Sequence, residues 1–348
     1  DKSLLEEQNK VQQRILESIR FECLYLIEQF QSGKSRKNIL DSLANLHQYF
    51  SELEVEGFEE LVCYFTAEGD YWLEATETSQ KKIQISSTKS GRILLSSLLP
   101  ESCQVLGVSA TLEISQRVSL ADLLGYPEAK FVKIEARRKQ DQEVVLVKDF
   151  PLVTETSLEV YAKEVADLLV EIQAFQQPIL VLFTAKDLLL AVSDLLPVSH
   201  LAQYKNGDVH QLKKRFEKGE QQILLGAASF WEGVDFSQQK EVIQIITRLP
   251  FDNPKDYMVQ KLNTKLREQG KNPFYDYSLP VAILRLKQAI GRTSRFQDQE
   301  SLVLLLDQRV VTKRYGKQIL DGLQQVLPLH TTVRERLVEQ AADFFERN

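Results

Sequence analysis

Short runs of apolar residues recur from residue 103 onward, and stretches with helical periodicity separate them. Runs that are apolar at successive positions are typical of strands buried on both faces of a parallel sheet. We predict such strands at 103–110, 143–147, 178–185, 221–227, 241–246 and 301–307. We predict helices at 161–175, 188–196, 209–216, 256–269 and 280–290. This alternation predicts a doubly wound α/β domain, in which functional residues gather at the carboxyl ends of strands.

The N-terminal part of the chain has a different pattern. Apolar residues at helical spacing form two stripes, at 11–30 and 39–46, on either side of a polar break at 31–35. This predicts a helical hairpin whose stripes pack on each other or on a neighbouring unit, and not a complete domain. Aromatic and alternating residues then predict two short strands, at 71–74 and 81–86.

Length and composition limit the class of protein. A chain of 348 residues exceeds the usual size of one hydrophobic core, so two or three structural units are expected. No apolar run approaches the roughly 18 to 20 residues that span a bilayer, and the first residues, DKSLLEEQNK, do not form a signal peptide or begin with Met. We therefore expect a cytoplasmic protein without membrane contact, and this chain could be part of something longer.

The cysteines and the net charge do not point to a particular kind of site. Cys23, Cys63 and Cys103 lie far apart with no Cys or His close by, which argues against a zinc site, an iron–sulfur cluster or a disulfide framework. We expect no metal site and interpret these cysteines as small buried residues in a reducing compartment. The net charge of −6 is weak evidence about nucleic acid in either direction.

Hydroxyl residues follow two of the predicted strands. Ser109 and Thr111 belong to the tripeptide SAT after the run QVLGV, where hydroxyls can bridge a phosphate-binding loop to a neighbouring domain. A helix N-cap or a turn is the alternative. Thr184 ends the run ILVLF before a predicted helix, which suits a nucleic-acid phosphate because helix N–H groups favour an anion. Plain N-capping is again the alternative.

The segment ASFWEGVDF at 228–236 follows a predicted strand and should be a loop. Gly233 permits a backbone turn close to a ligand, and Asp235 can hold an arginine or a ribose hydroxyl. Phe230 and Trp231 are predicted to be exposed and able to stack on a base, with a place in the core as the alternative for Trp231.

The segment QAIGRTSR at 288–295 places Gln288, Arg292 and Arg295 at four- and three-residue spacing. A helix would carry all three on one face. Guanidinium groups match phosphate oxygens in charge and geometry, so one hypothesis is an arginine finger that accelerates phosphoryl transfer. The other is a solvated helix end with ordinary surface arginines.

Basic residues gather in two places that could contact phosphates or simply form solvated helix faces. The first group is Lys205, Lys213, Lys214, Arg215 and Lys218, and the second is Arg309, Lys313, Arg314 and Lys317.

The order of these segments resembles helicase motifs III, IV, V and VI of superfamily 2, in its DinG/XPD-like branch. Their counterparts are SAT at 109–111, Thr184, SFWEGVDF at 229–236 and QAIGRTSR at 288–295. The resemblance extends to ITRLPFDNP at 246–254 and LLLDQRVVTKRYGKQIL at 304–320, and it covers roughly residues 70–325. It implies a RecA-like parallel sheet with flanking helices, to which the N-terminal helical segment is added.

The resemblance implies a role for each motif. Gln288, Arg292 and Arg295 would face the γ-phosphate of ATP, and Gly233, Asp235 and Gly291 would belong to the nucleotide site. Thr184 and the loop Ser229, Phe230 and Trp231 would contact single-stranded DNA, and Ser109 and Thr111 would couple hydrolysis to closure of two motor domains. The commoner family form is GRLIR. Here Thr293 and Ser294 stand between the two arginines, and both charges are kept.

Two motifs that an ATP-driven motor needs are not in the sequence: a G-x-x-x-x-G-K-[ST] loop and a D-E-A-H type acidic box. The GKS at 33–35 lacks the first glycine and follows a predicted helix, so it is interpreted as a turn. In the resembled family both boxes precede a helical arch domain. We therefore assign 1–80 to an arch remnant with its return strand, 81–140 to the end of motor domain 1, and 141–348 to motor domain 2.

The predicted function is that of the C-terminal part of an ATP-dependent 5′–3′ DNA helicase, monomeric and acting on single-stranded DNA. ATP and Mg²⁺ would serve the full-length protein, the chain would hold no iron–sulfur cluster, and the isolated chain would be inactive. A non-catalytic module that binds single strands or a protein partner is the alternative. A nuclease is disfavoured because the acidic residues at strand ends, Asp235 and Asp307, are too few.

Overall fold

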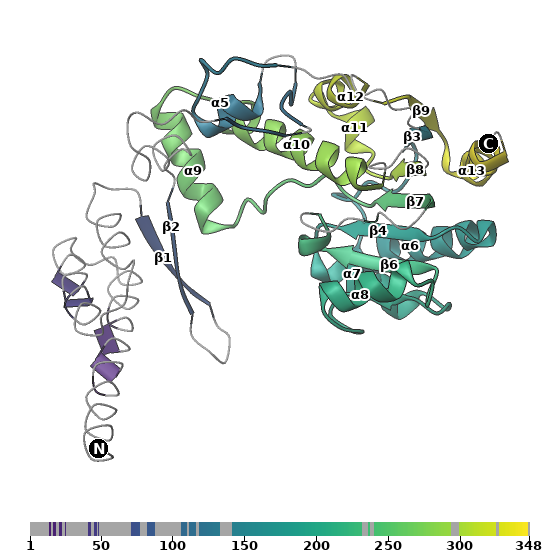
Figure 1. Cartoon of the computed structure of the whole chain (residues 1–348), viewed down its shortest axis with the longest axis horizontal. Coiled ribbons are helices and arrows are strands. Elements are labelled where there is room, and N and C mark those ends of the chain that lie inside the picture. The colour runs from purple at the N-terminus through teal and green to yellow at the C-terminus, as the bar shows by residue number, and fades with distance from the viewer. Residues whose placement is uncertain are drawn as a thin grey trace. The chain divides into compact units, whose positions relative to one another are not determined.

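The computed structural model describes residues 106–109, 111–115, 118–132, 141–231, 236, 240–293, 299–324 and 327–346, the backbone of 71–76 and 82–87, and single positions between 14 and 48. The chain divides into two compact units, which are treated separately below (Figure 1). Unit 1 combines Asp1–Leu99 with Pro254–Lys265, and unit 2 combines Pro100–Asn253 with Leu266–Asn348. The predicted domain boundaries at residues 80 and 140 stay a prediction.

Unit 1 contains the two predicted short strands. β1 (Tyr71–Thr76) and β2 (Lys82–Ser87) pair antiparallel along their full length. The described positions between 14 and 48 are all helical, in agreement with the two predicted helices. Asn45 Nδ2 donates a hydrogen bond to Glu22 Oε1 (3.4 Å), which joins the segments on either side of the polar break. This contact supports the predicted helical hairpin.

Within the described residues, unit 2 is built on a seven-stranded sheet in the order β5-β6-β4-β7-β8-β3-β9, and every neighbouring pair is parallel. The strands are β3 (Asp141–Val147), β4 (Ile179–Phe183), β5 (Leu201–Ala202), β6 (Ile223–Ala227), β7 (Glu241–Ile246), β8 (Glu300–Leu305) and β9 (Leu329–Thr332). Five of the six predicted buried strands are therefore confirmed, as β3, β4, β6, β7 and β8.

Helices alternate with these strands along the chain. They are α5 (Leu120–Leu124), α6 (Leu158–Ile172), α7 (Lys186–Leu195), α8 (Val209–Glu217), α9 (Tyr257–Glu268), α10 (Leu279–Ile290), α11 (Arg309–Thr312), α12 (Gly316–Gln324) and α13 (Leu337–Glu346), and most of α9 falls in unit 1. Short helical turns are Gln173–Phe175, Ala228–Phe230, Phe274–Ser278, Gly291–Thr293 and Arg334–Arg336. The five helices predicted from residue 161 onward are present as α6 to α10.

The two core clusters of unit 2 show which helices share a face of its sheet. Side chains of α6, α7 and α13 pack with Val145 and Val147, whereas those of α8, α10 and α12 pack with Val144 and Leu146. Successive strand residues point to opposite faces, so apolar residues at successive positions bury both. This is the physical reason that the predicted doubly wound α/β fold forms.

One predicted strand is not found. The described residues 106–109 of the run at 103–110 have no regular structure, and the side chains of Leu106 and Val108 are almost fully exposed. The apolar pattern is that of a buried strand, but a strand also needs a neighbour that accepts its backbone hydrogen bonds. Within the described residues no strand pairs with this segment.

Candidate functional site

Loops from neighbouring strands meet at the carboxyl edge of the unit 2 sheet, because all of its strands are parallel. Thr184 follows β4 directly, and Ser229 lies in the helical turn after β6; both side chains are exposed. The N-cap of α7 is Ala185, without a side-chain cap hydrogen bond, so the alternative that Thr184 caps this helix is wrong. Two hydroxyls and uncapped helix N–H groups thus border this edge.

The backbone after β6 turns sharply so that Ser229 faces solvent while Phe230 points inward. Ala228 has φ 40°, a conformation that is uncommon for a residue other than glycine. A Cβ on Gly226 would lie 2.5 Å from the ring of Phe230, so only glycine leaves room for that ring. Gly226 is therefore the sequence signal that the aromatic side chain folds back onto its own strand.

The predicted exposure of Phe230 and Trp231 is wrong. Phe230 is fully buried and Trp231 is 6% exposed, both in the core cluster under α8 and α10. The indole Nε1–H of Trp231 donates a 2.6 Å hydrogen bond to the carbonyl of Phe183 at the end of β4. A buried indole needs such a partner. Trp231 therefore ties the Ser229 turn to the strand end that presents Thr184, and neither ring can stack on a base in this conformation.

A cluster of charged residues follows β7 and β8 at the same edge. Asp307 is buried, accepts the backbone N–H of Leu249 (2.7 Å), and binds the guanidinium of Arg309 through both carboxylate oxygens, with a shortest N–O distance of 2.6 Å. Arg248 lies half-buried with its guanidinium carbon 5.4 Å from the ring centre of Tyr161. Burial lowers the pKa of Arg248, although its guanidinium stays charged at neutral pH.

The other candidate residues lie at the end of α10. Gln288 is half-buried on this helix, and Arg292 is 6% exposed in the helical turn Gly291–Thr293 that follows it. α10 ends at Ile290 and the backbone tightens into the turn Gly291–Thr293, so Gln288 and Arg292 do not lie on one regular α-helix; the predicted shared face with Arg295 stays a prediction. Arg295 lies outside the described residues.

The structure separates these two groups of residues. Gln142, the second residue of β3, donates a hydrogen bond to the carbonyl of Ile290, so Arg292 lies near the amino end of the strands, whereas Thr184 and Ser229 follow their carboxyl ends. A six-residue strand spans about 20 Å. Gly233 and Asp235 lie outside the described residues, between Trp231 and Phe236, which are both buried in the same core cluster.

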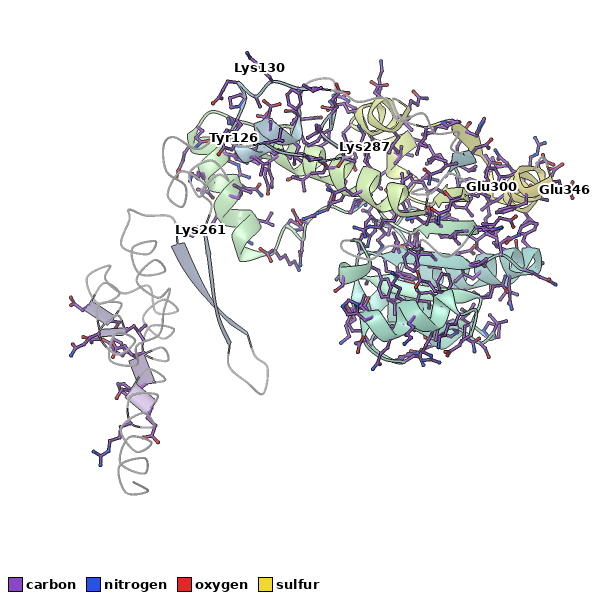
Figure 2. The ribbon with its side chains drawn as sticks, viewed as in Figure 1. Tyr126, Lys130, Lys261, Lys287, Glu300 and Glu346 are labelled. Carbon is purple, nitrogen blue, oxygen red and sulfur yellow. The ribbon has the colours of Figure 1, made fainter. Side chains whose placement is uncertain are left out.

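Ser109 and Thr111 form a local turn. Their hydroxyl oxygens lie 3.3 Å apart, and the backbone N–H of Thr111 donates to Ser109 Oγ (3.1 Å). The following residues attach to α10, because Lys287 Nζ donates to the carbonyl of Glu113 (2.8 Å); Figure 2 shows Lys287 on this helix. The two hydroxyl residues therefore form a turn, which was one of the two interpretations of this tripeptide. The segment after them is bound to α10, the helix that carries Gln288.

Comparison with known proteins identifies the region. Residues 168–326 match the family model described as "Helicase C-terminal domain". The chain is 28% identical over 342 residues to "3'-5' exonuclease DinG" of Bacillus subtilis, covering 92% of this chain and 35% of that protein. It is 37% identical over 111 residues to "ATP-dependent DNA helicase DinG" of Photobacterium profundum, covering 32% of this chain and 16% of that protein.

The fold agrees with these matches. A solved structure named "XPD_APO" superposes with a TM-score of 0.55 at 17% sequence identity, covering 86% of this chain and 63% of that one. Together, the family model over residues 168–326, the DinG relatives and the XPD structure support a DinG/XPD-like helicase C-terminal region of superfamily 2. Its parallel sheet with flanking helices is the RecA-like fold that was predicted. The chain spans only about a third of the Bacillus subtilis relative.

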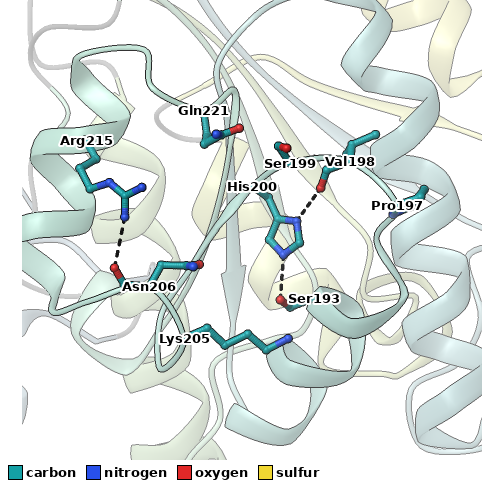
Figure 3. A pocket seen from close by; sticks show the side chains of 9 residues that line it. All are labelled: Ser193, Pro197, Val198, Ser199, His200, Lys205, Asn206, Arg215 and Gln221. Atoms are coloured by element: carbon teal, nitrogen blue, oxygen red, sulfur yellow. Dashed lines mark hydrogen bonds between the residues drawn. The ribbon is translucent and has the colours of Figure 1, made fainter.

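A cavity of about 500 Å³ beside β5 contains two members of the first basic group (Figure 3). Both are already engaged: Lys205 with Asp194 (2.6 Å), and Arg215 with Glu220 (2.7 Å) and the carbonyl of Asn206 (3.2 Å). The neighbouring His200 ring is held by Ser193 and Val198. These contacts are compatible with a solvated helix face, and phosphate contact by the first basic group stays a prediction.

Membrane spans and metal clusters are both missing from the part of the chain that the structure describes. Every helix there is too short or too polar to cross a membrane. Among the same residues, no group of three or more His, Cys, Asp or Glu side chains could hold a metal ion.

Proposed function

We propose that the chain is the nucleotide-sensing and DNA-contacting half of an ATP-dependent DNA helicase that moves 5′ to 3′ along single strands. The observation that carries this proposal is the position of two groups of residues on one rigid sheet. Arg292 lies next to the amino ends of the strands, and the hydroxyls of Thr184 and Ser229 lie at the carboxyl ends. A motor needs such a separation, because nucleotide and nucleic acid must occupy different surfaces of the same domain.

On the nucleotide side, Gln288, Arg292 and Arg295 would face the γ-phosphate of ATP, and Mg²⁺ would accompany that nucleotide. The phosphate-binding loop and the acidic box would come from a preceding motor domain in a longer protein. An arginine held in a buried position loses little freedom on binding, and a well-placed finger raises hydrolysis by roughly three to five orders of magnitude. Gly233, Asp235 and Gly291 would complete this side.

On the DNA side, Thr184 and Ser229 would donate hydrogen bonds to backbone phosphates. The uncapped N-terminus of α7 adds oriented N–H groups beside Thr184, which favours an anion there. The buried side chains of Trp231 and Phe230 would hold the Ser229 turn in place without contacting DNA themselves. Ser109 and Thr111 would couple the two motor domains, since the segment after them is bound to α10 through Lys287.

Substitutions in the full-length protein test this separation. Arg292→Ala and Arg295→Ala should abolish DNA-stimulated ATP turnover with little change in the dissociation constant for single-stranded DNA. Thr184→Ala with Ser229→Ala should raise that dissociation constant about tenfold, because two hydrogen bonds to charged phosphates are lost. Normal turnover with much weaker DNA binding in Arg292→Ala would show that the arginine serves DNA instead.

The isolated 348-residue chain is expected to hydrolyse no ATP, with or without single-stranded DNA. The reason is that the sequence holds no phosphate-binding loop and no D-E-A-H type box. Robust turnover by the purified chain would refute the view that a preceding domain supplies half of the active site.

Two other functions remain as alternatives to test. A relative is named an exonuclease, and this chain covers only 35% of it, so such an activity would reside elsewhere in a longer protein. In this chain, the carboxylate of Asp307 is already bound by Arg309 and the N–H of Leu249. A non-catalytic binding module is the second alternative, and DNA-stimulated hydrolysis by the full-length protein would exclude it.

A further inference from the structure

The carboxyl end of α10 is closed in an unusual way. The last carbonyls of a helix have no partner within the helix, and a glycine in the left-handed conformation often supplies the turn that satisfies them. Gly291 follows α10 with φ −65°, so it continues the right-handed path. Its backbone N–H reaches the carbonyls of Lys287 and Ala289. The carbonyl of Ile290 is left to groups outside the helix, and that of Ala289 receives a second donor from outside.

Two glutamine side chains from the sheet provide these donors. Gln142 on β3 donates its amide N–H to the carbonyl of Ile290 (2.9 Å), and Gln244 on β7 donates to that of Ala289 (3.0 Å). A carbonyl can only accept, so these contacts fix which side of each amide is the nitrogen. Gln142 Nε2 also lies 2.6 Å from the hydroxyl of Ser301 on the neighbouring strand β8.

Thr293 joins both glutamines in one network. Its hydroxyl donates its one proton to Gln244 Oε1 (3.1 Å) or to the carbonyl of Ile290 (3.3 Å). The hydroxyl oxygen also lies 3.3 Å from Gln142 Nε2, whose two N–H groups have nearer acceptors in Ile290 and Ser301. Gln142, Gln244, Thr293 and Ser301 are all buried. A buried polar network in which the groups satisfy one another is rigid, and the loss of one donor leaves the others unpaired where water does not reach.

Arg292 lies between residues of the chain that this network binds. Its predecessors Ala289 and Ile290 are held by the glutamines through their carbonyls, and its successor Thr293 is held through its hydroxyl. The backbone on both sides of Arg292 is therefore bound to β3 and β7. Both are interior strands that flank β8, where Gln142 and Val242 both pair with Ser301. The network therefore fixes the turn that carries the Arg292 side chain.

We propose that Gln142 and Gln244 are positioning residues for Arg292, acting through Thr293 and the end of α10. The inference rests on the proposed function, since it assigns a purpose to the turn that carries the proposed finger. It accounts for Thr293, which stands where the resembled family commonly has leucine. A leucine would offer no hydrogen-bonding group, whereas the threonine hydroxyl donates to Gln244 Oε1 or to the carbonyl of Ile290 and lies beside the amide of Gln142.

Methionine and valine substitutions in the full-length protein test the proposal. Gln142→Met and Gln244→Met keep the length of the side chain and remove the N–H donors, and Thr293→Val keeps its shape without the hydroxyl. Each should lower kcat for DNA-stimulated ATP hydrolysis by roughly 10- to 100-fold, because a catalytic group is displaced by a fraction of an ångström. KM for ATP and the dissociation constant for single-stranded DNA should stay within about threefold.

Gln222→Met is the matched control. Gln222 also bridges two backbone carbonyls with its amide nitrogen, those of Gln173 (3.0 Å) and Gln177 (2.9 Å), but these follow α6 and not α10. We expect Gln222→Met to lose about as much thermal stability as Gln142→Met and Gln244→Met, but to keep a normal kcat. Thr293→Ser keeps the hydroxyl that Thr293→Val removes, so its kcat should lie within about threefold of that of the unsubstituted protein. If a methionine variant does not fold, the valine and serine pair at 293 decides the question.

The outcomes distinguish a failure of the positioning role from a failure of the proposed function. Normal kcat in Gln142→Met, Gln244→Met and Thr293→Val, together with an inactive Arg292→Ala, would overturn the positioning role and leave the proposed function intact. Normal kcat in Arg292→Ala itself would overturn the proposed function and the positioning role with it. Loss of kcat in Gln222→Met equal to that in Gln142→Met would show a general effect of packing, and would also overturn the positioning role.

Discussion

Trp231 links the two strand ends that present the candidate DNA-contacting hydroxyls. Its indole N–H binds the carbonyl of Phe183, the residue before Thr184. Trp231→Phe removes this donor and leaves a buried carbonyl unpaired, so it should lower the free energy of unfolding by about 1–3 kcal/mol. Urea denaturation measures this change. In fluorescence anisotropy, single-stranded DNA affinity should change less than in Ser229→Ala; a larger loss without destabilisation would mean that the ring touches DNA.

The sequence located this segment but not the orientation of its side chains. An apolar run followed by ASFW predicts a strand and a loop, and aromatic residues in loops are often exposed. What turns Phe230 inward is the combination of Gly226 with the positive φ of Ala228, a conformation that no periodicity encodes. The role of Arg292 stays a prediction. Its spacing from Gln288 predicts that the two residues lie one helical turn apart, but it does not predict the tightened turn in which Arg292 lies.

Among the elements, the loops after β7 and β8 depend on one carboxylate. Asp307 joins the backbone of Leu249 to the guanidinium of Arg309, and it is 1% exposed. Asp307→Asn keeps the shape but removes the charge that pairs with Arg309. We expect a loss of about 3–5 kcal/mol in the free energy of unfolding, because a cation is left at a buried site without its partner.

The matched control for Asp307→Asn is Asp194→Asn. Asp194 pairs with Lys205 at the same 2.6 Å distance but with a side chain that is 72% exposed. Exposed pairs contribute about 0–1 kcal/mol, so this variant should unfold at nearly the same denaturant concentration as the unsubstituted chain. Equal effects at both positions would contradict a structural role for burial at Asp307.

Elements buried on both faces were the most predictable part of the fold. β4 and β6 are continuous apolar runs, whereas β7 and β8 are apolar apart from their first residues and the buried Gln244 and Ser301; helices cover both faces of these strands. β5 has two residues and β9, with the sequence LHTT, is half polar at the sheet edge, so neither gives a distinctive pattern. The run at 103–110 failed for a different reason, since a strand depends on its neighbours as well as on its own residues.

At the scale of the molecule, the sheet acts as a rigid connection between two surfaces. The buried glutamine network fixes the turn of Arg292 on one side, and the hydroxyls of Thr184 and Ser229 lie on the other. The order of motifs could be predicted from the sequence. Their distribution between opposite edges required the strand order, which is a long-range property.

The role of Arg292 is tested by the single-turnover rate of ATP hydrolysis by the full-length protein, measured with ATP and single-stranded DNA already bound. This rate reports the chemical step alone. Arg292→Ala should lower it by about three to five orders of magnitude, with unchanged affinity for both ligands. A single-turnover rate in Arg292→Ala within a few-fold of the unsubstituted protein would contradict the assignment of this turn to the nucleotide.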